Sequence, residues 1–153
     1  MMPDLNKTCL TRIDKNNGNI IWQKKTNQTM RPVDKSIVHI GNENYIIALQ
    51  EFGSGYNRII ILKIDNNGNI IAHKVNEDQN AIPISLSGIA KGTAKIGIYG
   101  QFTTTWAEKG IIIEMDFDLT QITRKIIYEN EEFIRFKNLD GTIEQIYKDG
   151  RQK

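Results

Sequence analysis

The chain of 153 residues has few of the side chains that usually carry chemistry. It contains one cysteine, two histidines and three prolines, and its 20 basic and 18 acidic side chains nearly balance. A single cysteine cannot form an internal disulfide, which argues against a disulfide-stapled secreted module and favours a reducing compartment. A net charge of +2 provides no electrostatic footprint for nucleic acid or for an anionic membrane surface.

Long hydrophobic runs are also lacking. The apolar run Ile59–Leu62 is far too short to cross a membrane, and the first residues, MMPDLNKTCLTR, hold no apolar segment typical of a signal peptide. We therefore expect a cytoplasmic protein that has no membrane or nucleic-acid partner. A chain of this length is expected to form a single domain, residues 1–153.

The composition favours strands and turns over helices. The chain has 27 Ile but only 7 Leu and 6 Ala, together with 15 Asn and 12 Gly. Isoleucine is favoured in strands, asparagine and glycine are favoured in turns, and good helix formers are scarce. The sequence therefore predicts an all-β fold.

An internal repeat organises this composition. Residues 12–24 read RIDKNNGNIIWQK and residues 63–74 read KIDNNGNIIAHK, while residues 114–125 keep only the beginning and end of the pattern. The aligned Asp14, Asp65 and Asp116 are 51 residues apart. A fixed period of this length is typical of repeat architectures.

Each period carries four strand signals joined by short turns, in the order of an antiparallel meander. The expected strands are 36–40, 45–50, 58–65 and 70–75 in one period, and 84–89, 95–101, 110–116 and 122–128 in the next. Two continuous apolar runs, Ile59–Leu62 and Ile111–Ile113, do not alternate with polar residues, which is typical of strands buried on both faces.

The two ends of the chain resemble two halves of one repeat. Strands at 10–14 and 20–25 match the third and fourth strands of a repeat, and strands at 133–136 and 142–148 match the first and second. We expect a half repeat at 9–25, repeats at 36–75 and 84–128, and a half repeat at 133–148. The sequence thus predicts three four-stranded repeats, one of them assembled from both termini, and the complementary halves favour a complete chain.

The repeat is similar to a known pattern. The segments GNENYIIAL (41–49), IIILKIDNNGNII (59–71) and RIDKNNGNIIW (12–22) resemble bacterial β-propeller repeats of about 50 residues, which have a Lys-Ile-Asp-x-x-Gly-Asn hairpin. Trp22 matches the closing aromatic residue of that hairpin, whereas Ala72 departs from it. The resemblance implies propeller-like blades and carries no catalytic residue.

Three blades are too few for a usual propeller ring. One solution is a compact monomer of three sheets. A second is a homodimer that exchanges terminal strands and leaves no sheet edge unpaired. A third is an irregular β-sandwich built from the same hairpins.

The Asp-Asn-Gly turns invite comparison with a calcium-binding loop. Counted from Asp14, position 5 is Gly18, which has no side-chain acceptor, and position 12 is Lys25, which repels a cation. We therefore interpret these turns as structural, with the aspartate accepting hydrogen bonds from turn N–H groups. We expect no metal site and no cofactor, because His39, His73 and Cys9 alone do not make a ligand set. Cys9, beside Leu10, is predicted to be a small buried side chain.

Two equivalent loops, between the second and third strands of each repeat, carry aromatic residues. Because equivalent loops of a ring emerge on one face, they are predicted to form a contact patch, since Tyr, Trp and Arg are enriched at interface hot spots. The predicted binding residues are Phe52, Tyr56, Arg58, Phe102, Trp106, Glu108 and Lys109. An alternative is that the aromatic side chains fold back over the blade core. The polar segment Thr26–Lys35 is a second candidate loop.

These observations favour a non-enzymatic protein-binding module of the bacterial cytosol. One form of this hypothesis is an immunity protein that inhibits a toxin by masking its active site. The alternative is a carbohydrate-binding, lectin-like β-propeller that uses Trp106 and Thr103–Thr105. An enzyme ranks last, because the sequence offers no nucleophile–base pair.

Overall fold

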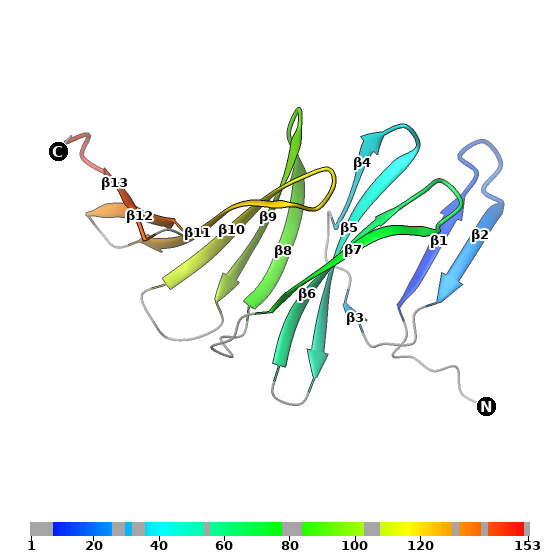
Figure 1. Cartoon of the computed structure of the whole chain (residues 1–153), viewed down its shortest axis with the longest axis horizontal. Helices are drawn as coiled ribbons and strands as arrows, with labels where there is room; N and C mark the ends of the chain where they lie inside the picture. Colours follow the sequence, from blue (N-terminus) through cyan, green and yellow to red (C-terminus); the bar gives the residue numbers. More distant parts are fainter. Residues whose placement is uncertain are drawn as a thin grey trace.

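The chain folds into antiparallel sheets and, in the part that the structure describes, contains no helix. The computed structural model describes residues 8–25, 30–31, 36–53, 56–77, 84–102, 108–129, 132–138 and 141–151. Its strands form three sheets, none of which closes into a barrel (Figure 1). The all-β prediction is confirmed.

The sheets are layers of one stack. We call the first layer the N-terminal hairpin; it consists of β1 (Cys9–Ile13) and β2 (Ile20–Lys25). The central sheet is the meander β4 (Ile37–Gly41), β5 (Asn44–Gly53), β6 (Tyr56–Ile64) and β7 (Ile70–Glu77), with β3 (Met30–Arg31) added beside β5. The outer sheet is the meander β8 (Ile84–Lys91), β9 (Lys95–Phe102), β10 (Glu108–Asp116), β11 (Gln121–Glu129), β12 (Phe133–Asn138) and β13 (Ile143–Tyr147).

The central sheet is buried on both faces. Toward the outer sheet, Ile59 and Ile61 belong to one apolar cluster with residues such as Ile113. Toward the N-terminal hairpin, Ile60 and Leu62 belong to a second cluster, against which Leu10 and Trp22 pack. The prediction that Ile59–Leu62 is buried on both faces is therefore confirmed.

The same prediction is wrong for the second apolar run. Ile111 and Ile113 point into the stack and are buried, but Ile112 points to the other side and is only partly buried. The reason is the position of the outer sheet at the end of the stack, where no further described sheet covers it.

The three predicted aspartate turns share one hydrogen bond, although the Asp14 turn is one residue longer than the other two. Asp14, Asp65 and Asp116 each accept a hydrogen bond from the backbone N–H two residues later, at 2.8, 2.8 and 3.0 Å. The left-handed residue of the turn is Gly18 or Gly68 in the first two copies and Leu119, with φ 66°, in the third. A leucine in this conformation costs on the order of 1 kcal/mol, and burial of its side chain in the core offsets that cost.

One expected feature is not found: no repeat is assembled from both termini. The β12–β13 hairpin pairs with β11 and extends the outer sheet, while β1 and β2 form a sheet of their own. The physical reason is the short connection, because residues 130–132 alone join β11 to β12 and favour a hairpin over a long-range closure. Figure 1 shows the two terminal hairpins at opposite ends of the stack. The result is an open stack, consistent with the sandwich alternative.

A short strand interrupts the polar segment Thr26–Lys35, which was predicted as a loop. Met30 and Arg31 pair with Glu51 and Gln50 of β5 and form β3. The rest of that segment, 26–29 and 32–35, lies outside the described residues.

Polar contacts hold the N-terminal hairpin to the central sheet at one turn. The Arg12 guanidinium and the Trp22 indole N–H both donate hydrogen bonds to the carbonyl oxygen of Asn66, at 2.7 and 2.9 Å. Lys24 donates to the Asn69 side chain at 3.0 Å. The indole ring of Trp22 lies so close to Gly68 that a Cβ added there would be 2.8 Å from it.

Alanine substitutions at Gly18 and Gly68 should distinguish the effect of the Trp22 contact on stability from the effect of backbone strain. Gly18 and Gly68 have the same φ of 75°, but nothing lies within 4 Å of a Cβ added at Gly18. We expect Gly18→Ala to lower the free energy of unfolding by about 1 kcal/mol through backbone strain. Gly68→Ala should lower it by a further ~1–3 kcal/mol, because Trp22 must shift. Urea denaturation followed by circular dichroism measures the free energy of unfolding of both variants. Equal losses of stability in the two variants would show that the Trp22 indole moves aside at no cost in free energy.

The carboxylate of Asp65 should make the stability of the central turn depend on pH. Hydrogen bonds from the backbone and side chain of Asn69 lower the pKa of Asp65. A lowered pKa in the folded state adds stability above the ordinary pKa of about 4, and this stability is lost as the pH falls through the folded pKa. Asp65→Asn should therefore be less stable than the wild type at pH 7, and the difference should be smaller at pH 2.5. Urea denaturation at both pH values checks this, and a constant difference would contradict it.

Candidate functional site

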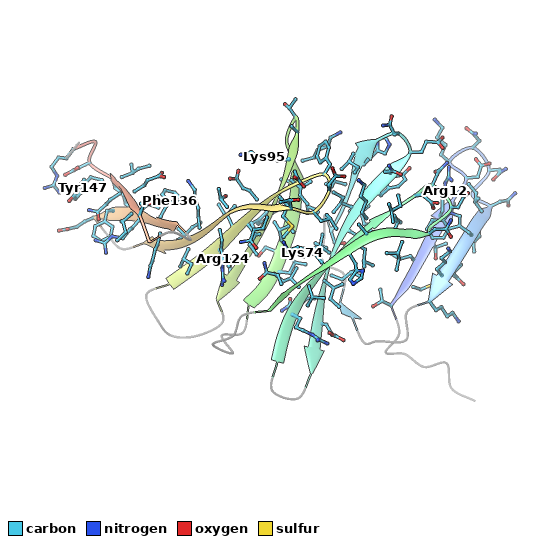
Figure 2. All side chains as sticks on the ribbon, in the orientation of Figure 1. Arg12, Lys74, Lys95, Arg124, Phe136 and Tyr147 are labelled. Atoms are coloured by element: carbon cyan, nitrogen blue, oxygen red, sulfur yellow. The ribbon has the colours of Figure 1, made fainter. Side chains whose placement is uncertain are left out.

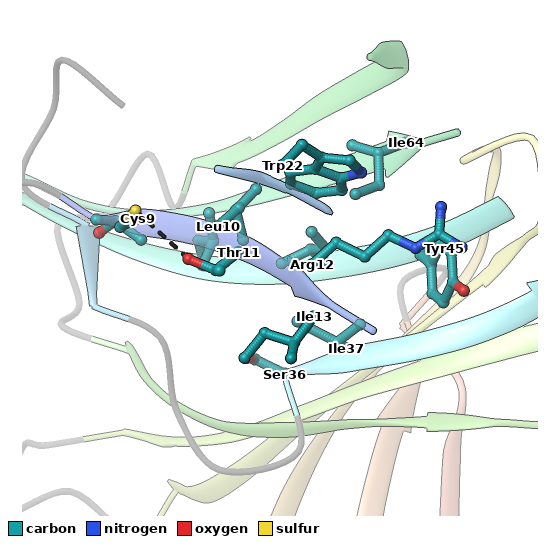
Figure 3. Close-up of a pocket in the computed structure, with 13 residues that line it drawn as sticks. Cys9, Leu10, Thr11, Arg12, Ile13, Trp22, Ser36, Ile37, Tyr45 and Ile64 are labelled. Atoms are coloured by element: carbon teal, nitrogen blue, oxygen red, sulfur yellow. Dashed lines mark hydrogen bonds between the residues drawn. The ribbon is translucent and has the colours of Figure 1, made fainter. Parts of the chain in front are cut away.

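An apolar groove runs along β1, between the N-terminal hairpin and the central sheet. Figure 3 shows the residues that line this groove. Its volume is about 480 Å³. The hairpin contributes Leu10, Ile13 and Trp22, and the central sheet contributes Ile37, Tyr45 and Leu49. The groove exists because the two-stranded hairpin is narrower than the sheet that it covers.

The floor and the rim of this groove differ in exposure. Ile47 and Leu49 of β5 form the floor and are 1% and 0% exposed. Ile13 and Ile37 stand at the rim and are 56% and 51% exposed. Exposed isoleucines beside a buried apolar floor mark a surface that can contact another apolar group.

The open edge of β1 borders the same groove. One edge of β1 pairs with β2, and no described strand pairs with the other. An unpaired strand edge presents backbone N–H and C=O groups to any extended segment that approaches it. Groove and edge together form the candidate site, which we call the β1 groove.

Arg12 is the charged side chain of the β1 groove. It extends along the groove toward Tyr45, and its Nη1 donates to the Asn66 carbonyl (Figure 3). A guanidinium has five donors, so this hydrogen bond leaves it able to pair with an acidic group.

A second groove, of about 470 Å³, lies on the β2 side of the hairpin. Ile60 and Leu62 contribute apolar surface, and Lys24, Lys25 and Arg58 bring positive charge. Ile70, which is 60% exposed, also lines this second groove. The second groove differs from the β1 groove in its positive charge and in bordering β2, the equivalent of the last strand of a repeat.

The outward face of the outer sheet is mixed in character. Tyr99 is 37% exposed and Ile112 is partly buried. Lys95 forms an ion pair with Glu114 at 2.5 Å, and hydrogen bonds from Lys95 and Thr123 lower the pKa of Glu114. Figure 2 shows side chains along this face, including Lys95 and Phe136.

The predicted contact patch is described only in part. Phe52, Tyr56, Phe102, Glu108 and Lys109 lie at the ends of β5, β6, β9 and β10, but their side chains lie outside the described residues. Trp106 and Thr103–Thr105 lie outside them altogether, so the patch and the lectin alternative stay predictions.

Arg58 has a structural partner inside the central sheet. Its guanidinium forms an ion pair with Glu51 at 2.5 Å across the β5–β6 pair, and Glu51 is buried. Beside Glu51, the buried side chain of Gln50 accepts a hydrogen bond from Leu86 N–H at 2.9 Å and so ties the central sheet to β8.

Cysteine and histidine do not assemble a site. Cys9 is exposed, so its predicted burial is wrong; the outward face of the hairpin has no described sheet over it. His39 is exposed and lies beside Tyr45, with ring centroids 5.1 Å apart and ring planes tilted by 48°, and His73 is exposed on the β2 side. Among the described residues, no group of three or more His, Cys, Asp or Glu side chains could hold a metal ion.

The β1 groove was not predicted from the sequence. The signal that could have found it is the half repeat at 9–25, since a third strand without its second strand leaves one edge open. No helix in the described ranges is long and apolar enough to cross a membrane. No family model matches the chain, and no curated protein matches it significantly.

The buried carboxylate of Glu51 should make Arg58 a stability determinant. We expect Arg58→Met to lower the free energy of unfolding by about 2 kcal/mol, because Glu51 loses its ion-pair partner. The double variant Glu51→Gln/Arg58→Met should recover at least half of that loss, since no unpaired charge remains buried. A double-mutant cycle by urea denaturation measures the coupling, and additive losses would contradict it.

Proposed function

We propose that the chain is a non-enzymatic protein-binding module of the bacterial cytosol, which binds an extended segment of a protein in the β1 groove. The observation that carries the proposal is the coincidence of an open strand edge with an apolar groove along the same strand. Such a site suits β-strand addition, in which main-chain hydrogen bonds supply affinity and a side-chain pocket supplies specificity.

The dimensions of the groove support an extended ligand. The five residues of β1 offer main-chain groups over about 16 Å, at ~3.3 Å per residue. The floor at Ile47 and Leu49 and the rim at Ile13 and Ile37 would contact alternate side chains of the added strand. The inhibitor of a toxin is one form of this function and stays a prediction.

A charge at the rim should abolish the proposed binding without unfolding the protein. Ile37 is half exposed, so Ile37→Glu should cost little stability, but it places a carboxylate against an apolar ligand. The immobilised wild type should recover a stoichiometric protein partner from lysate of the source cells at physiological salt. Ile37→Glu should bind that purified partner at least ~10-fold more weakly.

Ile71→Glu is the matched control, because Ile71 is 52% exposed on β7 and borders neither groove. It should bind like the wild type, and amide hydrogen exchange of residues 9–13 should slow in the complex. Equal binding by the Ile37 variant, with unchanged exchange in β1, would rule out the β1 groove as the binding site.

A further inference from the structure

The occupant of the β1 groove can be inferred from the repeat. We propose that β13 of a second copy of this chain pairs antiparallel with the open edge of β1 and fills the groove. This inference deepens the proposed function, on which it rests, by naming the protein segment that the site binds.

β1 and β13 occupy complementary positions of the repeat. β6 and β10 lead into the Asp65 and Asp116 turns as β1 leads into the Asp14 turn. In both complete repeats that strand pairs with the strand before it, β6 with β5 and β10 with β9. β13 has the place of β5 and β9, since it follows the first strand and a turn.

Both partners of this missing pair are open. β1 pairs only with β2, and β13 pairs only with β12, among the strands that the structure describes. They lie at opposite ends of the stack, so β13 cannot reach the β1 edge of its own chain in this arrangement (Figure 1). A second copy can supply β13 and so complete the sheet β12–β13–β1–β2.

The repeat also predicts the register. Tyr45 pairs with Ile64, and Ile96 pairs with Met115. Ile13 precedes its turn aspartate as Ile64 and Met115 do. Ile143 pairs with Lys137 across its hairpin, as Tyr45 pairs with His39 and Ile96 pairs with Lys91. Ile143 should consequently oppose Ile13 of the second copy.

This register brings complementary side chains together. It places Glu144 opposite Arg12 and Ile146 opposite Leu10. Arg12 and Leu10 point toward the central sheet, where Arg12 reaches Asn66 and Leu10 packs on the second cluster. Paired residues of antiparallel strands point to the same side. The carboxylate of Glu144 would thus face the guanidinium, and Ile146, which is 60% exposed in one copy, would enter the apolar groove.

Reciprocal pairing between two copies uses the open β1 and β13 edges of both chains. A closed dimer of about 35 kDa leaves none of these edges unpaired, which favours it over an open chain of copies. The proposal thus assigns Ile13 and Ile37, at the rim of the groove, and Ile146 of the partner chain to one interface.

A disulfide test can read the register directly, because Cys9 is the chain's single cysteine. The proposed register places Tyr147 opposite Cys9, and opposed Cβ atoms lie ~4.5–5.5 Å apart, close enough for a disulfide after small adjustments. The wild type, carrying a mass tag, is mixed with Cys9→Ser/Tyr147→Cys, and oxidised glutathione is added. We expect a mixed disulfide dimer on a non-reducing gel, identified by mass spectrometry as Cys9 joined to residue 147.

The matched control is Cys9→Ser/Ile143→Cys, which moves the thiol four residues along the same face, about 13 Å away. It should form at least ~10-fold less mixed dimer with the wild type. Mixed dimer at equal levels from both variants, or dimers of one protein alone, would overturn the proposed register and pairing.

A second measurement does not depend on replacing Tyr147. Light scattering on wild-type protein should show a dimer, and Glu144→Lys should raise its dissociation constant about tenfold, because two cations then face each other. Asp149→Lys, a charge change outside the strand pair, is the control and should dimerise like the wild type. A wild type that stays monomeric at high micromolar concentration would overturn the proposal.

The two proposals can fail separately. If Ile37→Glu abolishes binding of another protein while no mixed disulfide forms, the groove binds a foreign strand and self-pairing is wrong. If the mixed disulfide forms but no other protein is recovered, the groove serves assembly alone.

Discussion

The structure depends on the burial of both faces of the central sheet. Isoleucine, leucine and alanine occupy successive positions of β5 and β6, so neither face of these strands is suited to water. Full burial of one such side chain contributes roughly 1.5–3 kcal/mol. The outer sheet must therefore cover one face and the N-terminal hairpin the other, and the layered stack follows from that requirement.

The layers meet through equivalent positions of the repeat. Arg12 reaches from the hairpin to the turn at Asn66, and Lys63, its equivalent in the central sheet, reaches Asp118 in the turn of the outer sheet, at 2.9 Å. The apolar contact beside these polar pairs is made by residues of different size in the two interfaces. Trp22 from the strand lies on Gly68 in one interface, whereas small Ala72 faces the cluster that contains Leu119 in the other. A large and a small residue have exchanged places, so the same space is filled and the layer spacing can be kept.

Sequence patterns were sufficient to predict most strands and the aspartate turns, because alternation and Asn-Gly turns depend on a few neighbouring residues, and the 51-residue period repeats them along the chain. They were not sufficient to predict the partner of β12, since pairing with β11 or with β1 satisfies the same pattern, and the short connection at 130–132 decides between them. Arg58 illustrates the same limit at the level of a side chain. Its loop position suggested a contact residue, but its neighbour across the sheet, Glu51, sets its orientation.

The two ends of the stack differ from the faces that are covered. On the outer sheet, Gly97, Tyr99, Gly110 and Ile112 occupy the positions of Ile46, Ala48, Ile59 and Ile61 in the central sheet, so this face is less apolar than the buried one. The terminal layers of a stacked repeat remain soluble when their outward faces are polar. These layers are only partly so, since Ile13 and Ile21 on the hairpin and Tyr99 and Ile146 on the outer sheet stay exposed. A face of mixed polarity can contact water in the free chain and can bury apolar area when another surface covers it, whereas a core face such as that of β5 and β6 is suited only to burial.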